Sequence, residues 1–217
     1  MLKLNFMSVT EIFDKGGPVV WILLAYSIIA LAIVLERYLH FFLMGKLPGN
    51  FSTAIQNATN GDDVRSLVTD LRGPEIAILK GLLDAHRRGV LDLIRVATRI
   101  GSWELQRMQR GFRTLSLLGD TAPLLGLFGT ITGMIKAFMV IDQMGGKVDA
   151  QMLAGGIWEA MLTTGVGLAV ALPVLFLLHW LEGRAERHAH AMQHYASMLI
   201  EILPHKDIPS IIESAKS

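Results

Sequence analysis

Glu159 is the only full charge in the apolar stretch from Ala150 to Leu181, and Thr163 and Thr164 follow it at helical distance. A carboxylate is costly to hold in hydrocarbon, so such residues normally face a bundle interior, a water cavity or an ion path. Threonine hydroxyls can coordinate water or ions on a wet surface, although they also bond their own helix backbone. The three residues therefore predict either a proton path or polar bonding between helices.

Small residues recur at helical spacing beside these polar groups, on two apolar stretches. They are Gly126, Thr130, Gly133 and Ala137 on one stretch, and Ala160, Thr164, Gly167 and Ala171 on the other. Lipid supplies no hydrophobic drive for helix association, so close packing of small residues must do that work. The two stripes predict tight contact between two helices, with the threonines either in that contact or lining a pore.

Two further charges lie on the first of these stretches. Asp120 precedes the stripe and could guide protons to the cytoplasm or simply sit at the membrane interface. Lys136 lies about one turn from the opposite end, where a lysine can extend its ammonium group to the aqueous surface. We expect Lys136 to lie at that surface.

Histidines are the candidate metal ligands. His190 and His194 share one face of a predicted helix, His188 lies close by, and His179 is near the end of the last apolar stretch. Imidazoles bind zinc, but no cysteine is available to complete a thiolate site. We therefore predict no metal, no cofactor and no enzymatic activity. The alternative, an intramembrane metalloenzyme, predicts stoichiometric metal in the purified protein.

The composition predicts an integral membrane protein, because 52% of the residues are hydrophobic and only 18% are charged. The net charge of +1 and the absence of a dense basic run argue against a nucleic-acid partner. Crossing roughly 30 Å of hydrocarbon takes about 20 helical residues. Three stretches meet that length, residues 16–43, 114–141 and 157–181.

The distribution of Lys and Arg orients these spans. Residues 44–113 hold eleven of them, whereas the segment 142–156 holds only Lys147. Positive residues are retained on the cytoplasmic side. We therefore expect residues 1–15 and 142–156 outside, and residues 44–113 and the tail 182–217 in the cytoplasm.

The cytoplasmic parts are expected to be helical. Asn60 is expected to start one helix, and Gly73 with Pro74 to break it and open the next. Apolar residues at helical spacing run from Leu91 into the second span, and a similar stripe follows the third span as far as Pro204. The fold class expected is an all-α membrane protein with three transmembrane helices, of which the second and third extend into a helical cytoplasmic region.

Two motifs and one further segment resemble those of a known family. APLLGLFGTITG (residues 122–133) and IWEAMLTTGVGLAVALP (residues 157–173), together with GPEIAILKGLLDAHRRG (residues 73–89), resemble the MotA/TolQ/ExbB proton channel family. Three spans with an outside N-terminus match the ExbB and TolQ branch, whereas flagellar MotA proteins have four spans.

The resemblance implies a homopentamer in the bacterial inner membrane that encloses a dimer of an ExbD-like or TolR-like single-span protein. That partner would carry the proton-binding aspartate. Thr130 and Thr164 would line the inner pore beside it, with Glu159 toward the outer half of the same surface and Thr163 next to it. Membrane lipids would surround the complex. Proton flow would drive it, and the mechanical work would pass to a TonB-like or TolA-like protein.

The process that is driven is expected to be TonB-dependent outer-membrane transport, as for an ExbB-like protein. The alternatives are a TolQ-like role in envelope maintenance and cell division, and a passive membrane scaffold. A scaffold would tolerate Glu159→Ala and Thr164→Ala with little loss of function, whereas a motor subunit would not.

Overall fold

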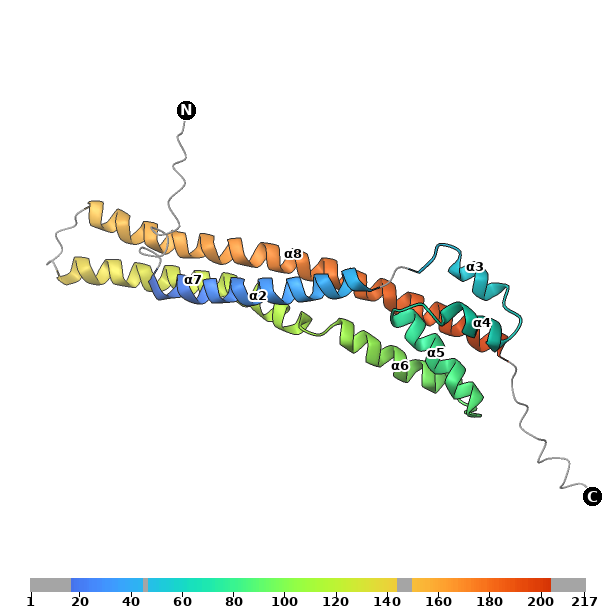
Figure 1. Ribbon diagram of the computed structural model, residues 1–217. Coiled ribbons are helices and arrows are strands. Elements are labelled where there is room, and N and C mark those ends of the chain that lie inside the picture. Colours follow the sequence, from blue (N-terminus) through green and yellow to red (C-terminus); the bar gives the residue numbers. More distant parts are fainter. Residues whose placement is uncertain (1–16, 45–46, 144–149, 204–217) are drawn as a thin grey trace, which may run out of the picture. The chain divides into compact units, whose positions relative to one another are not determined.

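The computed structural model describes residues 17–44, 47–143 and 150–203, and within them the chain forms helices and no strands (Figure 1). This confirms the all-α fold class. The helices are α2 (Gly17–Leu43), α3 (Phe51–Gln56), α4 (Gly61–Val68), α5 (Pro74–Arg87), α6 (Leu93–Met108), α7 (Phe112–Gln143) and α8 (Ala150–Ile202).

Three of these helices, α2, α7 and α8, are long and apolar enough to cross a membrane. The predicted spans 16–43, 114–141 and 157–181 fall on them, apart from residue 16. That residue, the expected outer segment 1–15 and residues 144–149 of the expected outer loop lie outside the described residues. Helix α8 runs on for 53 residues, which confirms the predicted extension of the third span into a long helix.

The expected continuous helix from Leu91 into the second span is wrong. Helix α6 ends at Met108, and α7 begins only at Phe112. Gly111 lies between them with φ +87°, a left-handed conformation that glycine adopts without steric cost. A Cβ at this position would also lie 2.8 Å from Ile33 Cγ2. A glycine with positive φ, rather than a proline, therefore separates the two helices.

One compact unit combines α2 up to Tyr38, α7, and α8 up to Leu181. Its buried cluster joins all three helices: Val19 and Leu23 from α2, Ala122 from α7, and Ala171 from α8. Large apolar side chains elsewhere on these helices are exposed, for example Phe128 and Phe176. This unit therefore combines a buried cluster between its helices with exposed apolar faces, as expected for helices that pack in lipid.

The second unit combines the end of α2, helices α3 to α6, and α8 from Glu182 onward. Its centre consists of fully buried aliphatic side chains, including Ile55, Val64, Leu79, Leu82 and Leu199. Large apolar side chains gathered away from water are the signature of a hydrophobic core. This unit is packed as a water-soluble domain is packed.

The helix starts in the second unit follow the predicted signals. The Asn60 side chain accepts hydrogen bonds of 3.0 Å from the backbone N–H groups of Asp62 and Asp63, which caps α4. Pro74 occupies the first turn of α5, where its missing N–H costs nothing, and Gly73 before it has φ 143°. Both predicted helix starts are confirmed, whereas α4 already ends at Val68, before Gly73.

Candidate functional site

The backbones of α7 and α8 approach each other most closely at glycines. A Cβ on Gly126 would lie 3.0 Å from both the Thr163 carbonyl oxygen and Thr164 Cα. A Cβ on Gly167 would lie 2.7 Å from the Ala122 carbonyl oxygen and 3.1 Å from Gly126 Cα. Because these neighbours are backbone atoms, they cannot rotate away from an added side chain. At this level the two helices touch backbone to backbone.

The close approach continues toward the far end of α7. A Cβ on Gly133 would lie 3.1 Å from Ala160 Cβ, and a Cβ on Gly156 would lie 2.6 Å from Ala137 Cβ. Ala160 and, further along α8, Ala171 are buried. All six small residues of the predicted stripes therefore lie at helix contacts of this unit.

Thr163 and Thr164 both direct their hydroxyl groups at one carbonyl oxygen of α7, that of Gly126. The Thr164 hydroxyl donates to it over 3.1 Å, and the Thr163 hydroxyl lies 3.3 Å from it. Thr163 also lies 2.7 Å from the Ala160 carbonyl oxygen of its own helix, and only 3% of its surface is exposed. Thr163 is thus enclosed between the helices, whereas the half-buried Thr164 can meet water or a partner.

Thr130 is half-buried on α7. Its hydroxyl donates over 2.7 Å to the Leu127 carbonyl oxygen of α7 itself. The residue of α7 that faces Thr163 is Gly129, where a Cβ would lie 2.5 Å from Thr163 Oγ1. Gly129 was missing from the predicted stripe, although a step of three residues from Gly126 keeps the same helix face.

Glu159 lies one helical turn before Thr163 and is half-buried. Its Oε1 is 3.7 Å from the position that a Cβ of Gly17 would occupy, so the carboxylate lies at the first residue of α2. The N-terminal end of a helix carries partial positive charge and stabilises nearby anions. Among the described residues Glu159 forms no hydrogen bond or ion pair.

The other predicted polar residues lie apart from this contact. Asp120 is exposed and accepts a hydrogen bond of 2.9 Å from the Ser116 hydroxyl group. Lys136 is exposed. The His179 ring lies 2.8 Å from the Leu175 carbonyl oxygen of its own helix. No group of three or more possible metal ligands is found among the described residues.

A polar pair that the sequence did not reveal lies in the second unit. His188 Nδ1 of α8 lies 2.5 Å from Glu75 Oε1 of α5, and Glu75 is 3% exposed. The imidazole ring also stacks on Phe41 at 6.0 Å between ring centroids. Burial, with a smaller contribution from the Glu75 carboxylate, raises the pKa of Tyr195 nearby. His188 thus joins α5 to α8.

Comparison with known proteins places these features in a family context. Residues 77–194, which include both motifs of α7 and α8, match the model of the MotA/TolQ/ExbB proton channel family. The chain is 28% identical over 204 residues to the biopolymer transport protein exbB1 of Vibrio cholerae, a match that covers 89% of each protein. It is 27% identical over 192 residues to the Tol-Pal system protein TolQ of Haemophilus influenzae, covering 80% of this chain and 82% of that protein.

A protein of Methanothermobacter thermautotrophicus named as an ExbB homolog is 28% identical over 185 residues. That match covers 83% of this chain but only 65% of the relative, so the chain spans just under two thirds of that protein's length.

Proposed function

This chain belongs to the MotA/TolQ/ExbB proton channel family, and on that premise we propose that it is an ExbB-like subunit of a proton-driven motor. With an ExbD-like or TolR-like single-span partner, it converts the proton motive force into mechanical work. A TonB-like protein passes that work to transport across the outer membrane. Moving one elementary charge across 100 mV releases about 2.3 kcal/mol, so several protons suffice for a conformational cycle.

The observation that supports this proposal best is a pair of half-buried polar side chains on α8. Glu159 and Thr164 are five positions apart, about 7.5 Å along the helix axis and about 140° around it, so water has to bridge them. Neither is sealed into the α7–α8 contact as Thr163 is. A carboxylate followed by a hydroxyl can relay protons through water to an acidic residue of a partner helix.

Each polar residue has a distinct role in the proposal. Glu159 collects protons at the outer half of the path, and Thr164 and Thr130 line the inner half beside the partner's aspartate. Thr163 holds α8 against Gly126 and so fixes the position of Thr164. Asp120, which is exposed on α7, marks the exit to the cytoplasm.

The proposed assembly is a homopentamer around a dimer of the single-span partner. It lies in the bacterial inner membrane with the N-terminus in the periplasm and the C-terminus in the cytoplasm. Exposed large apolar side chains on α7, such as Leu124, Leu127 and Ile131, support contacts with lipid or with other subunits.

Native mass spectrometry of the chain co-expressed with its candidate single-span partner tests the assembly. The proposal predicts a pentamer that retains the partner dimer. A chain that stays monomeric and ignores the partner would overturn it. In cells, Glu159→Ala and Thr164→Ala should abolish function at normal protein levels, whereas full activity of both variants would favour a passive scaffold.

A TolQ-like role is the second candidate, because the TolQ relative matches the chain over a similar length at similar identity. Complementation separates the two roles. An ExbB-like protein restores energised nutrient uptake in a strain that lacks its own ExbB. A TolQ-like protein instead restores envelope integrity and cell division in a strain that lacks TolQ.

A further inference from the structure

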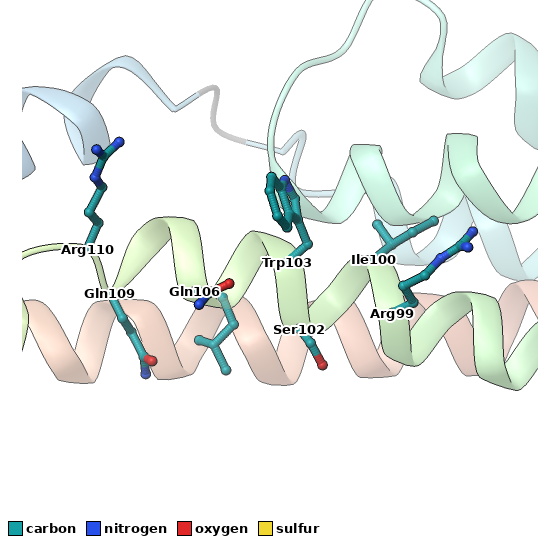
Figure 2. Close-up of a pocket in the computed structure, with 8 residues that line it drawn as sticks. Arg99, Ile100, Ser102, Trp103, Gln106, Gln109 and Arg110 are labelled. Atoms are coloured by element: carbon teal, nitrogen blue, oxygen red, sulfur yellow. The ribbon is translucent and has the colours of Figure 1, made fainter.

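Lys136 is a cation in an apolar part of α7, because the residues from Ile131 to Ile141 are otherwise uncharged. Charged residues within a membrane span are costly, and they usually pair with one another. The arginines of α6 differ. Arg99 and Arg110 line an open hollow of about 1090 Å³ in the second unit (Figure 2), where no span has to hold them. A partner for Lys136 is therefore expected within the spanning unit.

Lys136 and Glu159 lie at nearly the same depth beside the α7–α8 contact. Where the two helices touch, a Cβ on Gly133 would lie 3.1 Å from Ala160 Cβ. At a rise of about 1.5 Å per residue, Lys136 lies about 4.5 Å beyond Gly133, and Glu159 lies about 1.5 Å before Ala160. The helices run in opposite directions, so both steps lead toward the same end of the unit. The two charged residues therefore differ by only about 3 Å in depth.

The two residues also lie on the same side of the contact. Lys136 follows Gly129 by seven positions, and Glu159 precedes Thr163 by four, so each shares a helix face with that residue. Gly129 faces Thr163, because a Cβ on this glycine would lie 2.5 Å from Thr163 Oγ1. A lysine carries its ammonium group on a flexible four-carbon stem. The exposed Lys136 can therefore bring its charge to the half-buried Glu159 carboxylate.

Few other charged groups surround Glu159. Helix α2, whose first residue lies beside it, has no charged residue from Gly17 to Leu35. Helix α8 has no further charge as far as Leu181, and the remaining charge at this end of α7 is the exposed carboxylate of Asp142. Lys136 is therefore the only lysine or arginine at this end of the described spanning unit.

We propose that Lys136 is the counter-charge of Glu159 in the proton path. The inference rests on the proposed function, in which Glu159 collects protons at the outer half of that path. When Glu159 is ionised, the Lys136 ammonium group pairs with its carboxylate and offsets the cost of holding an anion in the span. When a proton binds, the carboxylate becomes neutral, and the ammonium group withdraws to the aqueous surface. The returning ammonium group favours release of the proton into the path. Lys136 is thus a positioning residue that acts through Glu159.

Thiol crosslinking tests whether the two positions face each other, and the chain has no cysteine to give a background. A short bifunctional thiol reagent in native membranes should join Lys136→Cys to Glu159→Cys within one chain. The matched control combines Lys136→Cys with Met161→Cys, which is 65% exposed on another face of α8, and should stay unjoined. Gel mobility and peptide mass spectrometry identify the product. Equal crosslinking of both pairs, or none in the first pair, would overturn the inference.

The pH profile of proton flux tests the charge itself. Flux into vesicles that contain the complex is measured while the pH on the outer side of the protein is lowered. Without its counter-charge in Lys136→Met, the carboxylate binds a proton more readily. Half-maximal flux should then move to higher pH by about half a unit, as expected for a partly exposed charge pair. Lys136→Arg keeps the charge and should keep the wild-type profile. Lys147→Met removes a lysine of the expected outer loop and should leave the profile unchanged.

Three flux results would also overturn the inference. The Lys136→Met profile could match the wild type, or Lys147→Met could shift it equally. The third is a shift in Lys15→Met instead, since Lys15 precedes Gly17 by two positions, outside the described residues. In each case, wild-type flux that is lost in Glu159→Gln leaves the proposed function standing, and only the counter-charge is wrong. A wild type without partner-dependent flux would remove both.

Discussion

The spanning unit, which combines α2 up to Tyr38, α7, and α8 up to Leu181, is held together differently from the second unit. At the α7–α8 contact, glycine and alanine bring two backbones together, and two threonines bond one carbonyl oxygen of Gly126. In the second unit, aliphatic side chains such as Leu79 and Leu82 fill the centre, and the polar pair Glu75–His188 lies beside them.

The solvent explains the difference. Lipid tails are as apolar as leucine, so helices in a membrane gain stability from close packing and interhelical hydrogen bonds, without a hydrophobic drive between them. In water, burying a large apolar side chain contributes about 1.5–3 kcal/mol by itself. The spanning unit should therefore be sensitive to added volume, and the second unit to removed volume.

The largest expected effect comes from adding volume to the spanning unit. Gly167→Val places a Cβ 2.7 Å from a backbone oxygen of α7, and that oxygen cannot rotate away. The cost should exceed the roughly 1–3 kcal/mol that is typical of overpacking. We expect complete loss of the assembled complex in native mass spectrometry. Gly165→Val is the matched control, because nothing lies within 4 Å of its Cβ position, and it should assemble normally.

The next largest effect comes from removing volume from the second unit. Leu82 is fully buried, so Leu82→Ala should cost about 2–5 kcal/mol through lost burial and the cavity left behind. The readout is a lower melting temperature of the purified protein by circular dichroism. Leu91 is 71% exposed, so Leu91→Ala should have the same melting temperature as the wild type. Equal melting of both variants would contradict the hydrophobic core described here.

A smaller effect is expected from the polar pair in the second unit. Glu75→Ala leaves the His188 ring without its buried acceptor, at a cost of about 1–3 kcal/mol. Glu75→Gln retains an acceptor oxygen, so this variant should lose less stability than Glu75→Ala. Thermal unfolding measures the melting temperatures of both variants and of Asp70→Ala, a control at an exposed position. If Glu75→Ala melts no lower than Asp70→Ala, the pair does not join α5 to α8.

The smallest effect on stability, with a large effect on activity, is expected at Thr164. Thr164→Val removes one hydrogen bond, and such bonds contribute only about 0.6 kcal/mol between membrane helices. Assembly should therefore persist while proton transport fails. Thr132→Val, whose hydroxyl bonds its own helix, is the control and should keep both properties. A Thr164→Val variant that fails to assemble would give the residue a structural role instead.

The sequence predicted the spans and the long C-terminal helix because their signals are local: length, hydropathy and helical periodicity. It also predicted which faces of α7 and α8 hold the small residues. The helix break before α7 was missed because Gly111 was not recognised as a stop signal, although glycine is the residue that most often follows a helix C-terminus.

Two features of the sites could be found only from the three-dimensional structure. Thr130 and Gly129 both fit a helical stripe from Gly126, and only the packing places Gly129 against Thr163. Glu75 and His188 are 113 positions apart, so no local pattern links them. Contacts between distant parts of the chain leave no periodic signal in a single sequence.

Proton flux into vesicles that contain the purified complex tests the central claim most directly. A pH-sensitive dye inside the vesicles reports flux for the wild type, Glu159→Gln, Thr164→Val and the control Thr132→Val, with and without the single-span partner. The account predicts flux only with the partner, at wild-type levels in Thr132→Val and at the background of protein-free vesicles in the other two variants. Unchanged flux in both Glu159→Gln and Thr164→Val would contradict a proton path along α8.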